Sequence, residues 1–328
     1  MDSELAYLIG AIEPADAAAA AVCKKKMRSV DGDKRLAALA TQLAGIRRTA
    51  APAPLRKGVV IFAADHAVDG GENETKGRNS KADALEIASG RGAVNKIAHR
   101  IGAGVLLLDV GLEADLPESP GFQVLKVMHG SRFFGRQAAM TEDEMLDALF
   151  SGVQVAENLA DEGYTAIALG NLGERALLSA FMVTAPFLSA NLDLLRADTH
   201  AARQMKNLQG LWEKAGVDGR QPLRILQYFG APDIAALTGV VLAAAKRRLA
   251  VVFDNAVTGA AVLTAGALCP HALDYVLPSA AYVEPVHRMQ MRKLGMQPFL
   301  QTAAHADCAM GSVLGLSLLD AAVQLLTE

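Results

Sequence analysis

Aromatic residues are scarce in this sequence, at 5% of 328 residues, whereas hydrophobic residues of all kinds make up 52%. A large core must therefore consist mainly of Ala, Val, Leu and Ile, which is typical of buried parallel sheets. Cysteines are also few. Cys23, Cys269 and Cys308 show no CxxC spacing and cannot all pair. This usage favours a reducing, cytoplasmic location over an oxidising compartment.

The sequence also lacks a strong excess of charge and a membrane-spanning run. Its formal net charge is -3, which argues against a nucleic-acid partner because such a partner attracts a basic surface. Asp2 and Glu4 stand where a secretory signal would begin with basic residues, so we expect no signal peptide. The longest uncharged run, residues 255–273, is interrupted by residues typical of packed globular structure, among them Asn255, Gly259, Gly266, Pro270 and His271. We therefore expect no membrane association.

Short aliphatic runs alternate with helical patterns from residue 58 onward. The runs expected to form strands are Gly58–Ala64, Gly104–Val110, Tyr164–Leu169 and Leu249–Phe253, with Leu223–Tyr228 and Leu273–Leu277 as weaker candidates. Helices are expected over Ala82–Ile101, Thr141–Asp161, Pro232–Lys246 and Met310–Thr327. This alternation predicts an α/β fold, doubly wound, with a mostly parallel sheet.

Three regions are expected along the chain. Residues 1–50 are Ala-rich and lack a strand pattern, which predicts the N-terminal helical segment of a smaller helical domain. After the linker at residues 51–54, residues 58–300 form the expected Rossmann-like α/β domain. Residues 301–328 would add a loop and a helix that complete the smaller domain.

Polar residues and a glycine follow several of the expected strands. They are Asp65, Asp109, Gly170, Asn171 and Asp254. Because ligands of open parallel sheets bind at the carboxyl ends of the strands, these residues mark a candidate site at one edge of the sheet.

Motifs spread over residues 58–328 resemble, in their order and spacing, those of one enzyme family. They are Asp65–Val68, Gly90–Asn95, Asp109–Gly111, Ala138–Thr141, Gly230–Gly239, Asp254–Ala261, Glu284–Arg288 and the stretch from Pro298 to Leu316. Together they resemble the nicotinate-nucleotide:dimethylbenzimidazole phosphoribosyltransferase family, which activates the lower-ligand base of cobamides. Each motif alone is weak, whereas the ordered set is specific.

The resemblance implies a doubly wound α/β domain with a smaller helical domain, assembled as a dimer with sites near the subunit interface. It implies transfer of phosphoribose from nicotinate mononucleotide to an aromatic base. Such a transfer needs a phosphate cradle of backbone N–H groups and a general base that takes a proton from the incoming azole. No cofactor and no metal are expected.

The sequence departs from the family pattern where the chemistry is done. In the segment His305–Ser312, Cys308 stands where the family carries its general-base glutamate, and Asp307 and Ala309 replace glycines. A thiol is a poor substitute for a carboxylate base unless its pKa is lowered. Other segments that depart from the family's phosphate and base loops are Arg28–Leu36, Gly70–Lys81, Ala168–Ala176 and Ser189–Asn191.

Two residues are candidates for catalysis: Cys308, as a nucleophile or as a packing residue, and Asp307, as a replacement for the glutamate. The candidate substrate-binding residues are Asp65, His66, Gly170, Asn171, Gly173, Arg175, Asp254, Gly311 and Ser312. Several have structural alternatives, because Asp65 could cap a turn, His66 could satisfy a backbone carbonyl and Arg175 could lie on the surface. Glu284 and His287 could ligate a metal, but without a third ligand a packing role is favoured.

Two classes of function follow. The first hypothesis is a divergent phosphoribosyltransferase that takes nicotinate mononucleotide and a lower-ligand base. It would act as a homodimer on an altered base, or as the degenerate subunit of a heterodimer with a related chain. The alternative is a catalytically inactive homologue that binds a ligand or regulates. A thiol enzyme that uses Cys308 is a third interpretation.

Overall fold

The computed structural model describes residues 2–27, 34–67, 80–188, 210–302 and 308–326. The candidate Asp307 lies outside the described residues, as do the departing stretches at 28–33, 70–79 and 189–191.

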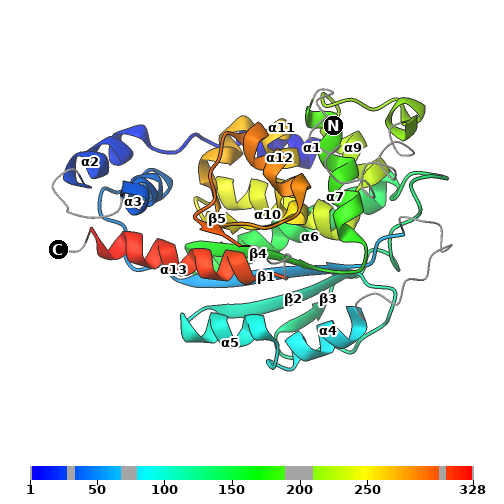
Figure 1. Ribbon diagram of the computed structural model, residues 1–328, viewed down its shortest axis with the longest axis horizontal. Coiled ribbons are helices and arrows are strands. Elements are labelled where there is room, and N and C mark those ends of the chain that lie inside the picture. Colours follow the sequence, from blue (N-terminus) through cyan, green and yellow to red (C-terminus); the bar gives the residue numbers. More distant parts are fainter. Residues whose placement is uncertain (1, 28–33, 68–79, 189–209, 303–307, 327–328) are drawn as a thin grey trace.

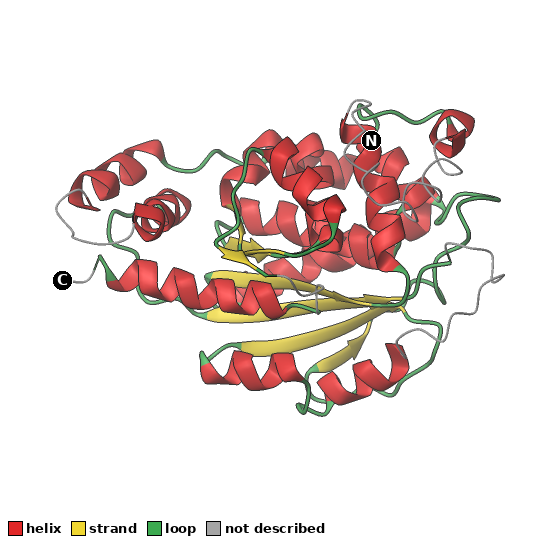
Figure 2. Ribbon diagram, in the orientation of Figure 1, coloured by secondary structure: helices red, strands yellow, loops and turns green. Residues whose placement is uncertain are grey.

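A six-stranded parallel sheet forms the centre of the structure (Figure 2). Its strands are β1 (Lys57–Ala64), β2 (Gly104–Gly111), β3 (Phe122–Val124), β4 (Ala166–Leu172), β5 (Ala250–Phe253) and β6 (Val276–Pro278). The strand order is β3-β2-β1-β4-β5-β6, and all neighbours are parallel. This is the strand order of doubly wound folds, so the predicted fold class is confirmed. A separate parallel pair joins β7 (Ala280–Ala281) to β8 (Leu300–Gln301).

Helices cover both faces of the sheet (Figure 1). On one face, α10 (Pro232–Lys246) contacts β1, β2 and β5, and α6 (Glu142–Asp161) and α11 (Ala256–Leu268) pack against α10. On the other face lie α4 (Ser80–Ala88), α5 (Ala93–Arg100) and α13 (Met310–Gln324). The remaining helical elements are α7 (Ala176–Thr184), η1 (Ala185–Leu188), α9 (Pro222–Phe229), η3 (Pro270–Tyr275) and α12 (Pro285–Leu294).

The N-terminal region contains α1 (Ser3–Gly10), α2 (Ala17–Met27) and α3 (Lys34–Arg47). α2 packs on α3, and α3 packs on α13 at one end of the molecule, whereas α1 contacts α10 (Figure 1). Helix α13 also contacts β4 and β5. It therefore connects the N-terminal helices to the sheet edge at which the chain's polar residues gather. The division of the chain into a larger and a smaller domain stays a prediction.

Three of the expected elements differ in the structure. Leu223–Tyr228 was expected as a weak strand but lies in helix α9, where Ile225, Leu226 and Phe229 are buried at helical spacing. A short apolar run alone does not separate the two. Leu273–Leu277 is divided between η3 and β6. The single helix expected over Ala82–Ile101 is two helices, because Gly90 adopts a positive φ of 76° between them.

Two glycines let α6 and α10 approach each other at backbone distance. A Cβ atom on Gly239 would lie 1.9 Å from the carbonyl oxygen of Leu149, and one on Gly152 would lie 1.8 Å from that of Ala236. Helix α10 is buried from Pro232 to Ala245. A side chain at this crossing would therefore force a shift of a helix in the middle of the core.

We expect Gly239→Ala to lower the free energy of unfolding by at least about 1–3 kcal/mol, because the added methyl group overpacks a backbone contact. Gly10→Ala is the matched control, since Gly10 lies in α1 with no neighbour within 4 Å of an added Cβ atom. Urea unfolding of both variants measures the difference. Equal stability of the two variants would contradict the close approach of α6 and α10.

Candidate active site

The strand order reverses between β1 and β4, which are neighbours although the chain between them visits β2 and β3. Such a switch point opens a crevice at the carboxyl ends of the strands. Asp65 and His66 follow β1, Asn171 lies near the end of β4, and Asp254 and Asn255 follow β5. The fold therefore brings these residues to one edge of the sheet.

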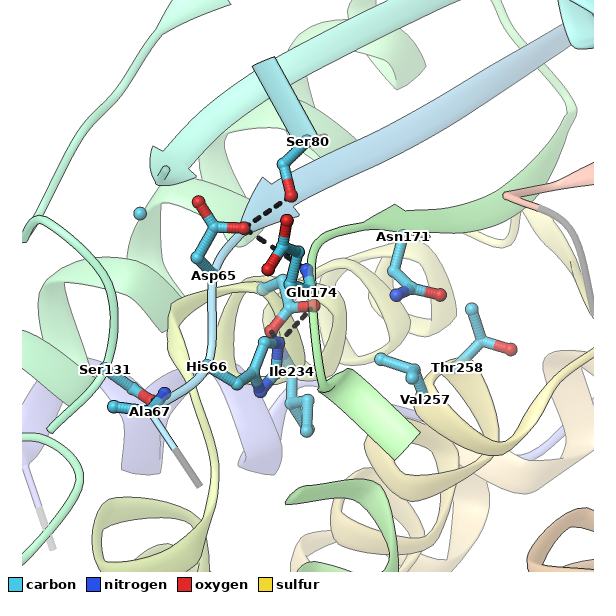
Figure 3. A network of polar contacts seen from close by, with 12 residues as sticks. Asp65, His66, Ala67, Ser80, Ser131, Asn171, Glu174, Ile234, Val257 and Thr258 are labelled. Atoms are coloured by element: carbon cyan, nitrogen blue, oxygen red, sulfur yellow. Dashed lines mark hydrogen bonds and ion pairs between the residues drawn. The ribbon is translucent and has the colours of Figure 1, made fainter. Parts of the chain in front are cut away.

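The Asp65 carboxylate joins four segments at this edge (Figure 3). Its Oδ1 accepts hydrogen bonds from the Ser80 hydroxyl at 2.6 Å and from the Glu174 backbone N–H at 3.2 Å. Its Oδ2 accepts from the Glu113 backbone N–H at 3.0 Å. The carboxylate thus fixes the segments after β2 and β4 and the start of α4 to the end of β1.

His66 lies beneath this edge, fully buried. Its Nε2 is 3.3 Å from both carboxylate oxygens of Asp233, which is also fully buried in the first turn of α10. The backbone N–H of His66 donates to the Glu174 carbonyl at 3.2 Å. The Asp65-His66 pair therefore connects the loop after β4 to both helical layers.

Asp109, expected at the same edge, closes the turn after its own strand. Its Oδ1 accepts from the backbone N–H groups of Gly111 and Leu112, and its Oδ2 lies 3.3 Å from the Lys126 ammonium. Burial raises the pKa of the Asp109 carboxyl, and Lys126 opposes that rise. Asp109 therefore stabilises the turn that follows β2.

Asn255 connects three segments and was missed as a candidate from sequence. Its side-chain oxygen accepts from the backbone N–H groups of Val257 and Thr258 and so caps α11. Its Nδ2 donates to Asn171 Oδ1 at 3.2 Å and to the Cys308 carbonyl at 3.3 Å. An Asn directly after a strand and before an apolar helix is an N-cap pattern that could have identified it.

Asp254 is fully buried and holds the first turn of α13. Its Oδ2 accepts from the Tyr282 hydroxyl at 3.0 Å and from the Ser312 backbone N–H at 3.1 Å. The Tyr282 oxygen in turn accepts from the Gly311 backbone N–H at 3.1 Å. A Cβ atom on Gly311 would lie 2.5 Å from that oxygen. Asp254 therefore holds the first turn of α13 at Gly311 and Ser312 through buried hydrogen bonds.

Two adjoining hollows form a cleft at this edge. The first, here the polar section, has an empty volume of about 800 Å³ and is lined in part by Asn171, Gly173, Arg175 and Asn255. The second has an empty volume of about 570 Å³. It is here called the apolar section after the side chains of Ile87, Val94 and Met310, although Glu86 also lines it. Asp83, Leu172 and Cys308 line both sections. These three residues therefore mark the junction.

Several helices begin around the cleft, and three of them follow β4, β5 or the segment that holds Cys308. α7 starts after Arg175, α11 after Asn255 and α13 after Ala309, and residues at each start line the cleft. Arg175 has a positive φ of 60° and its side chain makes no cap hydrogen bond to α7. Helix starts present backbone N–H groups and a partial positive charge. Within the polar section, the start of α7 with Arg175 is thus the part suited to an anion such as a phosphate.

The candidates from sequence divide into two groups. Those that line the cleft are Asn171, Gly173, Arg175 and Cys308. Those buried beneath or beside it are Asp65, His66, Gly170, Asp254, Gly311 and Ser312. Gly170 packs against α13, because a Cβ atom there would lie 2.4 Å from the Cβ of Ala309. The direct substrate contacts predicted for these residues stay predictions.

Cys308 precedes α13 in a left-handed conformation, with φ 40°. It is half-buried, and it forms no disulfide with Cys23 or Cys269, all three being among the described residues. Its carbonyl is the group that Asn255 holds. The hydrogen bond from Asn255 to the Cys308 carbonyl therefore helps to hold the Cys308 side chain at the junction of the cleft.

Glu284 and His287 lie in different surroundings. Glu284 is the N-cap residue of α12 and lines the polar section. His287 is buried, with Nε2 2.9 Å from the Ala280 carbonyl and Nδ1 3.2 Å from Gln290 Oε1. Burial lowers the pKa of His287. The described side chains include no group of three or more His, Cys, Asp or Glu residues placed to hold a metal ion.

A model of the phosphoribosyltransferase family matches residues 12–328, and the chain belongs to that family. It is 32% identical to a nicotinate-nucleotide–dimethylbenzimidazole phosphoribosyltransferase of Deinococcus radiodurans, over 99% of this chain and 93% of the relative. A protein of the same name from Geobacter sulfurreducens is 28% identical over 92% of this chain and 88% of the relative. Within the described ranges, no helix has both the length and the apolar character that a membrane crossing requires.

The structure is also similar to a crystal structure of nicotinate-nucleotide–dimethylbenzimidazole phosphoribosyltransferase from Thermus thermophilus. The TM-score is 0.86 at 27% identity, and the match covers 95% of this chain and 96% of the other. Both the sequence and the fold therefore support the family membership predicted from the ordered motifs.

Burial raises the pKa of Asp254 to about 7, although the hydrogen bonds from Tyr282 and Ser312 lower it. The folded state therefore binds this proton more tightly than the unfolded chain does. The resulting stability is fully present below about pH 4 and is lost as the pH rises to about 7. We expect Asp254→Asn to flatten this decline, which is on the order of a few kcal/mol, in urea unfolding across that range.

Glu144→Gln is the control for the pH series. A hydrogen bond from Arg132 lowers the pKa of Glu144 to about 2. Its stabilising contribution is present above about pH 4.5 and is lost as the pH falls through the folded value. This variant should alter only the acid side of the profile. A decline between about pH 4 and 7 that persists in Asp254→Asn would refute the assignment to Asp254.

Proposed function

We propose that this chain transfers phosphoribose from nicotinate mononucleotide to an azole base during synthesis of the lower ligand of cobamides. The observation that carries the proposal is the two-part cleft. The polar section offers Arg175 and the start of α7 to a phosphate, and the apolar section offers Ile87, Val94 and Met310 to a flat base. Relatives named for this reaction match nearly the whole chain.

The two sections suit the two halves of the reaction. A ring nitrogen of the azole bonds to C1′ of the ribose, and the bond from C1′ to the nicotinate nitrogen breaks, with its electron pair leaving on nicotinate. The azole loses its N–H proton. The sugar carbon gains positive charge in such a transfer, and fixed dipoles around it can stabilise that charge. Holding the donor and the acceptor in line supplies a further part of the rate enhancement. The junction at Asp83, Leu172 and Cys308 is where the two reactants would meet.

Arg175→Gln should raise the KM for nicotinate mononucleotide about 10- to 100-fold, the equivalent of one hydrogen bond to a charged group. The KM for the azole should change much less, because Arg175 lines only the polar section. Arg100→Gln is the control, since Arg100 is exposed in the last turn of α5. Steady-state assays of α-ribotide formation give both constants. An unchanged KM for the nucleotide would reject the role of Arg175.

A second candidate function is that of a degenerate subunit, which pairs with a related chain that keeps the chemistry. Cys308 at the position of the family's glutamate favours it. The native mass of the complex isolated from its own cell distinguishes this subunit from a homodimer. Nicotinate release by the purified chain alone would reject the degenerate-subunit function. Ligand binding without turnover, both alone and with any related chain, would instead indicate the inactive binding homologue.

A further inference from the structure

We infer that Asp83 is the general base of this chain, accepting the azole proton that the family's glutamate would accept at the position of Cys308. The inference rests on the proposed function and adds a catalytic residue to it. Asp83 lies in the first turn of α4, on a different element from Cys308. The acid would thus have moved from the loop before α13 to the start of α4, which lines the same cleft.

The position of Asp83 within the cleft supports this role. Asp83 lines the polar and the apolar sections, and it shares this position with Leu172 and Cys308. In an azole, one ring nitrogen attacks the sugar carbon and the other carries a proton. The general base must reach that proton. The proton lies on the side of the azole that faces away from C1′, so the base must line the section that holds the azole. Asp83 lines that section as well as the junction.

Two other carboxylates line the described part of the cleft, and each faces only one section. Glu284 lines only the polar section and so does not reach the section proposed for the azole. Glu86 lines the apolar section and is exposed. Asp83 is half-buried and lines both sections. Of the described acids it is therefore the one placed between donor and acceptor.

The start of α4 is held firmly enough to position a catalytic group. Ser80, the first residue of α4, donates its hydroxyl hydrogen to Asp65 at 2.6 Å (Figure 3). Residues three apart on a helix share a face, and Ser80 and Asp83 both line the polar section. The Asp65 carboxylate, which also holds the segments after β2 and β4, therefore sets the orientation of the helical face that carries Asp83.

The proposed step balances without a further reactant. One azole nitrogen uses its lone pair to bond to C1′, and nicotinate leaves with the electrons of the broken C1′–N bond. The proton on the other azole nitrogen moves to the Asp83 carboxylate, and the resulting carboxylic acid returns it to water after product release. The products are the α-ribotide, nicotinate and one proton.

Asp83→Asn keeps the shape of the side chain and removes its basicity. We expect kcat with benzimidazole to fall by about 10²–10⁴-fold, the usual contribution of a general base, and the KM for nicotinate mononucleotide to change by less than about threefold. Asp143→Asn is the matched control. Asp143 also lies in the first turn of a helix, α6, where it is exposed outside the cleft, and its replacement should leave kcat unchanged.

A second variant separates a base from a structural residue. Adding Cys308→Glu to Asp83→Asn returns a carboxylate to the same junction from a different segment. We expect it to recover at least about tenfold of the lost kcat, which a defect in α4 would not allow. The inference is overturned if Asp83→Asn keeps kcat within about threefold of the original chain, or if its loss equals that of Asp143→Asn.

A binding experiment tests Asp83 without turnover, so its failure is distinct from failure of the proposed function. Benzimidazole carries a ring N–H that can donate to Asp83, whereas 1-methylbenzimidazole does not. The original chain should bind benzimidazole about tenfold more tightly by calorimetry, and Asp83→Asn should lose that preference. A preference retained in the variant would overturn the inference even if the chain proves active.

Discussion

The cleft depends on the buried carboxylate of Asp65. It accepts hydrogen bonds from segments that follow β2 and β4 and from the start of α4, three places far apart in the sequence. Hydrogen bonds to a charged group contribute about 1.5–3 kcal/mol each. Because parallel strands end at one edge without hydrogen-bonded turns between them, a charged acceptor at the end of β1 is an effective way to hold their loops together.

A second set of contacts holds the segments around Asn171, Cys308 and the start of α13. Asn255 caps α11 and donates to Asn171 and to the Cys308 carbonyl, and Asp254 binds the first turn of α13 directly and through Tyr282. α13 in turn packs on α3. The C-terminal segment is thus attached to the sheet edge by polar contacts and to the N-terminal helices by packing. Leu172, the last residue of β4, lines both sections of the cleft.

Much of this architecture could be predicted from sequence, because uninterrupted aliphatic runs such as Gly58–Ala64 are typical of strands buried in a parallel sheet. The helix expected over Thr141–Asp161 is also present, and its start carries a capping box between Thr141 and Glu144. The prediction of a weak strand over Leu223–Tyr228 was wrong, because a six-residue apolar run carries too little periodicity to distinguish a helix from a strand. The role of Asn255 needed the structure, since its contacts with Asn171 and Cys308 span 84 and 53 residues.

The contacts that shape the cleft also explain how its chemistry can vary within a retained fold. Asp65 binds the backbone N–H groups of Glu113 and Glu174, Asp254 binds that of Ser312, and Asn255 binds the carbonyl of Cys308. Backbone groups are present whatever side chain a position carries. Substitution of Glu113, Glu174, Ser312 or Cys308 therefore keeps these backbone hydrogen bonds, while the side chain at the substituted position changes. A thiol can thus stand where the family has an acid, while a carboxylate on α4 lines the same junction.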